Sequence, residues 1–274
     1  MKQIITDKNI ERPEQSILTI YTGSEQFSFS IYDPEKAGSY FYEELTTENQ
    51  TDAFAVFKDA FFEQSFFSLP FRKVRILNRT PMFAFIPGSI HKDNYQDDFM
   101  NFLFSDTHGI SLSNSVSSTG ITVLYQLPEA IHRFMLRSFE KPEFVHYSAP
   151  VITYFLEKIK KTNVRRMAVN LQKKGLDIFC FSEKTFLLGN YFPCNSLTDA
   201  VYYILFTWKQ LQLNQSDDYL HITGNTILKE ELIARLSLYL QHIYCLSVSP
   251  KIYFEGVNTD CIPFELAALS LCEL

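Results

Sequence analysis

Side chains that could bind a metal ion or act as nucleophiles are scattered through this sequence rather than grouped in motifs. Its six histidines show no HxH or HxxxH spacing, and its five cysteines are widely separated and form no CxxC pair. Zinc sites need several such ligands at short, characteristic spacings. We therefore expect no metal site, and we expect the cysteines to be reduced, mostly buried thiols, as is usual in a cytoplasmic protein.

The common sequence motifs for phosphate binding and catalysis are also missing. The chain has no G-x-x-x-x-G-K-[ST], no G-x-G-x-x-G and no G-x-S-x-G, which mark P-loop, dinucleotide-binding and hydrolase sites. Ser111–Thr119 is rich in serine but lacks the glycine and lysine of a phosphate-binding loop, so we interpret it as a strand or loop. His221 lies in an apolar run and is interpreted as a hydrogen-bonded core residue rather than a catalyst.

One cluster of positive charge stands out near the middle of the chain. It lies at the end of a predicted helix and consists of Lys158, Lys160, Lys161, Arg165 and Arg166. Cations at a helix C-terminus complement the helix dipole, so one interpretation is a solvated helix end. The other interpretation is a docking patch for an acidic partner, a phosphate or a membrane surface.

Length and composition limit the class of protein. A chain of 274 residues suits two domains, and its 26 phenylalanines predict large aromatic cores. A formal net charge of −6 argues against a nucleic-acid binder, which needs a concentrated basic surface. No apolar run reaches the length of about 20 residues that a membrane span requires, and Met1–Arg12 is polar, unlike a signal peptide.

The elements that would position functional residues occur twice along the chain. Three short apolar runs, a helical pattern and a further apolar run fill Ser16–Leu77, and the same order returns in Arg166–Thr223. Strand-forming residues dominate these runs, and Phe27, Phe29 and Ile31 alternate with polar residues as in a half-buried strand. Each copy therefore predicts a three-stranded β-meander, a crossover helix and a strand that runs parallel to the first.

Amphipathic helices should cover these sheets. Phe54, Phe57 and Phe61 fall on one face of a helix that Thr51 or Asn49 could cap, and we interpret them as core. Trp208, in a helix capped by Ser196, is interpreted in the same way. Thr80–Gly88 is apolar and bounded by prolines, so it could be an edge strand or a packed loop. Further strands and helices are predicted at His91–Phe104, Ile121–Leu127, Pro128–Phe139, Glu143–His146, Ser148–Ile159, Leu228–Tyr239, Ile243–Ser247 and Pro263–Cys272.

Two copies of this plan resemble the actin-like ATPase (ribonuclease H-like) superfamily. Within it, the chain is similar to an uncharacterised bacterial family with an actin-like ATPase fold, and more distantly to actin-like assembly proteins of pilus and type II secretion machines. The resemblance implies an α/β protein with a duplicated fold. Each of two domains would hold a mixed sheet, an antiparallel meander plus parallel strands, flanked by helices. We expect these domains at residues 1–162 and 163–274, with a C-terminal helix that could pack back on the first.

The sequence departs from the superfamily's motifs at the matching positions. Active members carry Asp-x-Gly after the first strand of each copy, whereas this chain has Tyr21-Thr22-Gly23-Ser24 and Asn170-Leu171-Gln172. The adenosine motif, an apolar strand ending in Gly-Gly, reads Ile222-Thr223-Gly224-Asn225. Mg²⁺ prefers hard anionic oxygens, which tyrosine and asparagine do not supply. Nearby acids could substitute but fit a meander surface or turn better, namely Asp177, Asp217 and Asp218.

The resemblance therefore implies a degenerate nucleotide site, in the cleft between the two domains, and no catalytic residue. Its candidate residues are Thr22, Gly23, Ser24, Asn170, Gln172, Gly175, Gly224 and Asn225. We expect a cytoplasmic protein that acts as a non-catalytic interaction or scaffold module for an unknown protein partner. The chain could also form a homodimer. The alternative is a weak nucleotide-binding ATPase or phosphotransferase with residual use of ATP and Mg²⁺.

Overall fold

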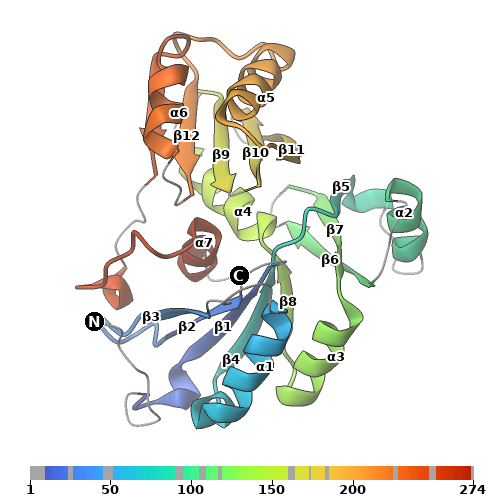
Figure 1. Cartoon of the computed structure of the whole chain (residues 1–274), viewed down its shortest axis with the longest axis vertical. Helices are drawn as coiled ribbons and strands as arrows, with labels where there is room; N and C mark the ends of the chain where they lie inside the picture. Colours follow the sequence, from blue (N-terminus) through green and yellow to red (C-terminus); the bar gives the residue numbers. More distant parts are fainter. Residues whose placement is uncertain are drawn as a thin grey trace. The chain divides into compact units, whose positions relative to one another are not determined.

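The computed structural model of the chain is drawn in Figure 1. It describes residues 10–23, 27–45, 52–90, 95–104, 109–116, 119–159, 164–172, 174–182, 185–224, 228–246 and 251–272. Contacts between residues group the chain into two compact units. The first comprises Met1–Ser115, Thr122–Tyr147 and Pro250–Thr259, and the second comprises Val116–Ile121, Ser148–Ser249 and Asp260–Leu274. The domain boundary expected between residues 162 and 163 stays a prediction.

A five-stranded mixed sheet forms the centre of the first unit, with strand order β3-β2-β1-β4-β8. Its strands are β1 (Ile17–Thr22), β2 (Phe27–Tyr32), β3 (Phe41–Leu45), β4 (Lys73–Asn78) and β8 (Glu143–His146). β1 is antiparallel to β2 and parallel to β4, in a register that pairs Ile17 with Lys73 and Thr22 with Asn78. The first predicted meander and its returning parallel strand are confirmed.

Two helices, α1 (Ala53–Glu63) and α3 (Glu129–Ser138), supply residues to the core of this sheet. Phe57 is fully buried and stacks on Phe27 at 5.0 Å between ring centroids, while Phe54 and Phe61 pack against the same core. The side chain of Asp52 caps α1 by accepting a hydrogen bond from the backbone N–H of Phe54 at 3.0 Å. The predicted aromatic face is confirmed, but the observed cap is Asp52; Thr51 and Asn49 lie outside the described residues.

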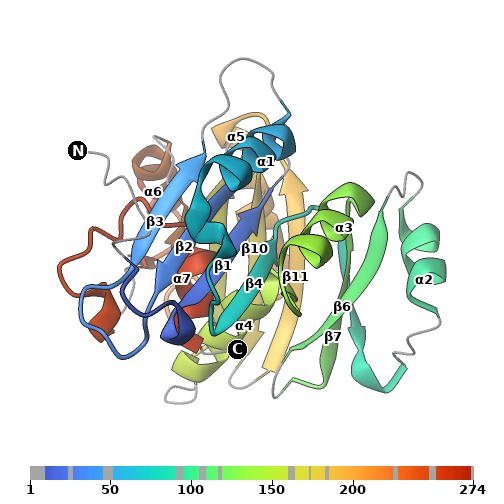
Figure 2. The same cartoon turned by 90° about the horizontal axis from the view of Figure 1, so that it is seen from below.

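A smaller sheet of three strands, in the order β5-β7-β6, was not predicted as a sheet. Its strands are β5 (Phe83–Pro87), β6 (Ile110–Val116) and β7 (Ile121–Leu127), and α2 (Gln96–Leu103) lies beside them (Figure 2). Asn114 of β6 joins this sheet to the first one. Its amide donates to the carbonyl of Phe144 at 2.9 Å and accepts from the N–H of His146 at 2.6 Å. One side chain thus replaces a neighbouring strand along the outer edge of β8.

The second unit repeats the five-stranded plan in the order β11-β10-β9-β12-β13. These strands are β9 (Arg166–Gln172), β10 (Gly175–Ser182), β11 (Thr185–Pro193), β12 (Tyr219–Thr223) and β13 (His242–Cys245). One face carries α5 (Leu197–Gln210) and α6 (Lys229–Leu236), whose core includes the buried Trp208. Ser196 and Asp199 form a reciprocal capping box at the start of α5, with hydrogen bonds of 3.1 Å in both directions.

The opposite face of the second sheet carries α4 (Ser148–Ile159) and α7 (Phe264–Cys272). Phe155 of α4 stacks on Phe181 of β10 at 5.3 Å, and Tyr154 meets Phe264 of α7 edge to face at 5.2 Å. α7 is almost entirely buried although it contains Glu265, whose exposed fraction is 1%. A buried carboxyl group in an apolar helix needs partners, and they lie at the end of β9.

A late segment of the chain completes the first unit. In the short 3₁₀ turn η6 (Ile252–Phe254), the carbonyl of Ile252 accepts from the N–H of Gly38, and the carbonyl of Tyr253 accepts from the N–H of Tyr40, both at 3.0 Å. The ring of Tyr253 also lies 4.7 Å from that of Tyr32. The turn therefore pairs with the residues that lead into edge strand β3. The other short turns are η2 (Pro13–Gln15), η3 (Ser65–Ser68) and η4 (Gly88–Ile90).

Candidate functional site

The carboxyl ends of parallel strands are where α/β sheets usually bind ligands, and in the first unit this end is closed by internal hydrogen bonds. Thr22, the last residue of β1, donates from Oγ1 to Oδ1 of Asn78, the last residue of β4, at 3.1 Å. Asn78 in turn donates from Nδ2 to the carbonyl of Gln126 at 3.0 Å. Gly23 follows Thr22, and Ser24 lies outside the described residues. The polar atoms of this strand end therefore bind one another.

The second unit has a buried polar cluster at the corresponding strand ends. Thr223 of β12 donates from Oγ1 to Oδ1 of Asn170 on β9 at 3.1 Å. Asn170 Nδ2 lies 3.2 Å from Oε2 of Glu265 on α7 and 3.5 Å from Oδ2 of Asp177 on β10. All four side chains are almost fully buried. Two carboxyl groups thus share one amide donor, at the position where the superfamily resemblance implies a magnesium-binding acid.

The polar residues at the strand ends of the two units do not occupy corresponding positions of the duplicated fold. Thr22 and Asn78 are two residues beyond Ile20 and Ile76, which belong to the core under α1 and α3, so they lie on that face of the sheet. Asn170 instead follows Val169, a core residue under α5 and α6, and faces α7. The residue of the first unit that corresponds to Asn170 is Tyr21, which is buried. The first copy therefore has a phenol and no carboxylate in place of the missing acid.

Two of the candidate glycines have structural reasons to be glycine. Gly224 has a φ of +98°, and a Cβ atom added there would lie 2.1 Å from the carbonyl oxygen of Leu171. Gly175 pairs with Gln172 across the β9–β10 hairpin, and a Cβ atom there would lie 2.6 Å from the carbonyl oxygen of Phe192. Backbone packing alone accounts for both residues. Asn225, beyond Gly224, lies outside the described residues.

Comparisons with known proteins place the chain in a family. The model of the family described as "Protein of unknown function (DUF3822)" matches residues 6–243. The chain belongs to this family. The comparison with curated proteins finds no match.

Solved structures agree with the fold of this DUF3822 protein. A Bacteroides thetaiotaomicron VPI-5482 protein with an actin-like ATPase fold and unknown function superimposes with a TM-score of 0.83 at 25% sequence identity, over 98% of this chain and 99% of that one. The PilM–PilN type IV pilus biogenesis complex matches with a TM-score of 0.65 at 11% identity, over 94% and 97% of the chains. The duplicated actin-like α/β fold expected from the sequence is confirmed.

The residues at the strand ends do not fit a magnesium–nucleotide complex. Magnesium needs exposed oxygen ligands, whereas Tyr21 and Asn170 offer no carboxylate and both are buried. Asp177 is also buried, so its expected place on a meander surface was wrong. Asp217 and Asp218 do lie in a turn, where each accepts a hydrogen bond of 2.6 Å from Asn214. Asp217 and Asp218 precede β12, at the opposite end of that strand from Thr223, so none of the three acids is an exposed ligand at the strand ends discussed here.

Sequence reasoning missed Glu265, although a signal was present. Residues 264–272 read FELAALSLC, so Glu265 is the one charged side chain in an otherwise apolar, buried helix. A single acid in such a context predicts a specific buried partner, because an unpaired buried charge costs several kcal/mol. Asn170 and Glu265 lie far apart in the sequence, so no local pattern indicated that they are partners.

The arginines of the predicted docking patch are engaged within the second unit. Arg165 forms an ion pair of 2.9 Å with Asp218 and donates to the carbonyls of Leu211 and Gln212 at 3.2 and 2.6 Å. Arg166 is mostly buried, and its guanidinium lies 5.6 Å from the ring centre of Tyr219. Lys158 belongs to α4, but its side chain, like Lys160 and Lys161, lies outside the described part of the chain. The docking patch therefore stays a prediction.

A buried histidine at the end of β8 is the most strongly perturbed base in the first unit. The pKa of His146 is lowered to about 3, mainly by burial and also by nearby Arg79, while a hydrogen bond with the backbone of Thr80 opposes the shift. Its ring lies 4.9 Å from that of Tyr125. Burial also raises the pKa of Tyr125 above its usual range. Both groups are neutral at pH 7, so the cluster is packing rather than acid–base machinery.

Acidification should lower the stability of the folded protein, because His146 is buried in its neutral form. An unfolded histidine takes up a proton near pH 6.5, whereas the folded His146 does so only near pH 3. The unfolded state therefore binds more protons between these values, and the free energy of unfolding should fall by up to about 1.4 kcal/mol per pH unit. Urea unfolding followed by circular dichroism from pH 7 to pH 5 should show this slope, and His146→Gln should flatten it. His132→Gln, at a partly buried ring on α3, is the comparison: partial burial lowers the pKa of His132 as well, so this variant should flatten the slope less than His146→Gln does. Equal slopes in all three proteins would refute the assignment.

Proposed function

We propose that this DUF3822 protein is a non-catalytic interaction or scaffold module built on an actin-like ATPase fold. The observation that carries the proposal is the buried cluster of Asn170, Thr223, Asp177 and Glu265. Its amide donor is already bound to carboxyl oxygens, and additional negative charge beside two acids would be repelled. The same strand end is therefore unsuited to the phosphates of a nucleotide.

A protein partner is the finer part of this proposal. Support comes from the likeness in fold to PilM, which was solved as a complex with PilN. At 11% identity that likeness concerns the fold alone, so it does not identify the partner of this chain. Among the described helices, none is long and apolar enough to cross a membrane. We place the protein, as a proposal, in the cytoplasm with a protein partner.

One observation favours the alternative of a nucleotide-dependent enzyme. Asp177 and Glu265 bring two carboxyl groups to the end of β9, so the second unit still has acidic side chains at this position. If α7 moved away from Asn170, these acids could substitute for the missing one. A nucleotide titration separates the two functions.

Calorimetric titration with ATP, in Mg²⁺ and again in EDTA, is the direct test. We expect no saturable heat at millimolar ATP in either condition and no phosphate release, because the described residues at the strand ends offer no exposed carboxylate and their side-chain donors are bound internally. Micromolar, Mg²⁺-dependent binding would contradict the proposal and support the enzyme. For the partner, a protein captured from cell extract should then bind the purified chain in a two-component titration, with an affinity that ATP does not change.

A further inference from the structure

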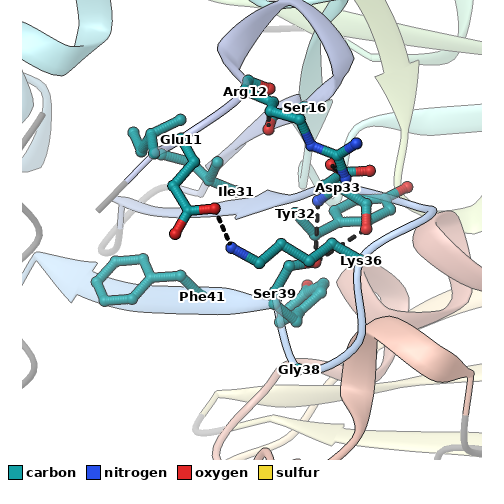
Figure 3. A pocket seen from close by; sticks show the side chains of 12 residues that line it. Glu11, Arg12, Ser16, Ile31, Tyr32, Asp33, Lys36, Gly38, Ser39 and Phe41 are labelled. Atoms are coloured by element: carbon teal, nitrogen blue, oxygen red, sulfur yellow. Dashed lines mark hydrogen bonds and ion pairs between the residues drawn. The ribbon is translucent and has the colours of Figure 1, made fainter. Parts of the chain in front are cut away.

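A cavity of about 190 Å³ lies within the first unit, away from the strand ends discussed above (Figure 3). One wall is the segment from Ile10 to Ser16 that precedes β1, and the other is formed by the end of β2, the β2–β3 loop and the start of β3. At roughly 30 Å³ per water molecule, it holds about six waters. It is smaller than the roughly 300 Å³ of pockets for drug-sized ligands, so it suits a molecule of amino-acid size.

Charged groups of alternating sign surround this cavity. Arg12 pairs with Asp33 at 2.5 Å, and Lys36 pairs with Glu11 at 2.7 Å. Asp33 lies at the base, where only 4% of its side chain is exposed, and its Oδ1 accepts from the N–H of Glu35 at 2.9 Å. Arg12, Lys36 and Glu11 are substantially exposed at the rim. Both an ammonium and a carboxylate group of one small ligand could find an opposite charge here.

The remaining walls are apolar or aromatic and are held firmly. Phe41 stands beside Lys36 and Glu11 in the cavity (Figure 3), and Ile31 lines it from β2. Tyr32 and Tyr40 are stacked at 5.5 Å between ring centroids, and both are buried. The loop requires glycine at position 38, because a φ of +63° and the close approach to the carbonyl of Glu255 both disfavour a Cβ atom. The site is therefore largely preformed.

We propose that this cavity binds a small zwitterion with an apolar side chain, a hydrophobic α-amino acid. The carboxylate would replace Glu11 as the partner of Lys36 beside Arg12, the ammonium would face Asp33 and Glu11, and the side chain would lie against Ile31 and Phe41. Breaking the Lys36–Glu11 pair costs little, because both side chains are exposed and ion pairs in water contribute little to stability. The small size of the ligand limits its affinity to the millimolar or submillimolar range.

The test uses the full chain and three related probes. Leucine has both charged groups, leucinamide lacks the carboxylate, and N-acetylleucine lacks the ammonium. We expect saturable binding of leucine by titration calorimetry or by NMR shifts, and binding of both analogues weakened at least about tenfold. Absence of leucine binding at tens of millimolar would overturn the proposal. Equal binding of N-acetylleucine would also overturn it, because the site would then recognise any apolar carboxylate.

Two surface variants locate the binding. Lys36→Gln should weaken leucine binding at least about tenfold, and Glu11→Gln should weaken it by a smaller factor, because Asp33 remains to face the ammonium. Both residues are exposed, so the variants should keep the thermal stability of the parent protein. Lys209→Gln, at an exposed position of α5 in the second unit, is the matched control and should bind leucine normally. Unchanged binding in Lys36→Gln would overturn the assignment. The outcome is independent of the nucleotide titration, because no residue is shared between the two sites.

Discussion

Gly224→Ala should lower the free energy of unfolding of the second unit by about 3–5 kcal/mol. Two costs combine: a left-handed φ costs about 1–2 kcal/mol for a residue with a Cβ atom, and the overlap with the backbone of Leu171 forces a shift of similar or larger cost. Urea unfolding followed by the fluorescence of Trp208 should report the loss directly, because this single tryptophan lies in the core of the same unit.

Gly120 provides a matched control for this substitution. It also has a left-handed φ, of +69°, but a Cβ atom there would meet nothing within 4 Å. Gly120→Ala should therefore cost only about 1 kcal/mol, measured by circular dichroism. If the two variants lost equal stability, packing on Leu171 would not be what requires glycine at position 224. The half-preserved adenosine motif would then need a functional explanation.

Asn170→Asp, which restores the acid of the superfamily motif, should destabilise the protein by about 3–5 kcal/mol instead of restoring a nucleotide site. The substitution keeps the shape but replaces a donor amide by a third carboxyl group beside Asp177 and Glu265. The variant should lose stability by Trp208 fluorescence in urea at pH 7, and it should bind no ATP. The deficit should shrink on acidification, because a protonated carboxyl group again supplies a donor.

Two further variants separate burial from charge in this prediction. Asn190→Asp adds the same charge at an exposed position on β11 of the same sheet and should change stability by less than about 0.5 kcal/mol. Glu265→Gln combined with Asn170→Asp exchanges the donor and the acceptor and should recover part of the lost stability. If the single variant were as stable as the parent protein, Asn170 would not depend on its buried carboxyl partners.

Local patterns in the sequence predicted most elements of the two five-stranded sheets. Alternation and apolar runs located β2 at Phe27–Tyr32 and β12 at Tyr219–Thr223 with the observed bounds. Repetition of the plan then supplied the parallel pairing of β1 with β4 and of β9 with β12. The three-stranded sheet was not predicted, although each of its segments was considered as a possible strand. Its order β5-β7-β6 depends on contacts that no local pattern encodes.

The resemblance predicted where a candidate site would lie, but not which residues contact one another there. The resemblance directed attention to the ends of β1, β9 and β12, and the buried polar residues Thr22, Asn170 and Thr223 lie there. What could not be predicted is that Asn170 contacts a helix that begins almost a hundred residues later. Such a pair depends on how α7 packs, and a single sequence without relatives contains no signal that connects its two members.

The position of η6 has a consequence for the order in which the protein is made. Ile252 and Tyr253 bond to the residues that lead into β3, which the ribosome produces more than two hundred residues earlier. In the nascent first unit, the rings of Tyr32 and Tyr40 therefore lack these contacts until η6 has been translated. A protein shortened before this turn would lack these contacts permanently, so η6 completes the packing around strands that are translated first.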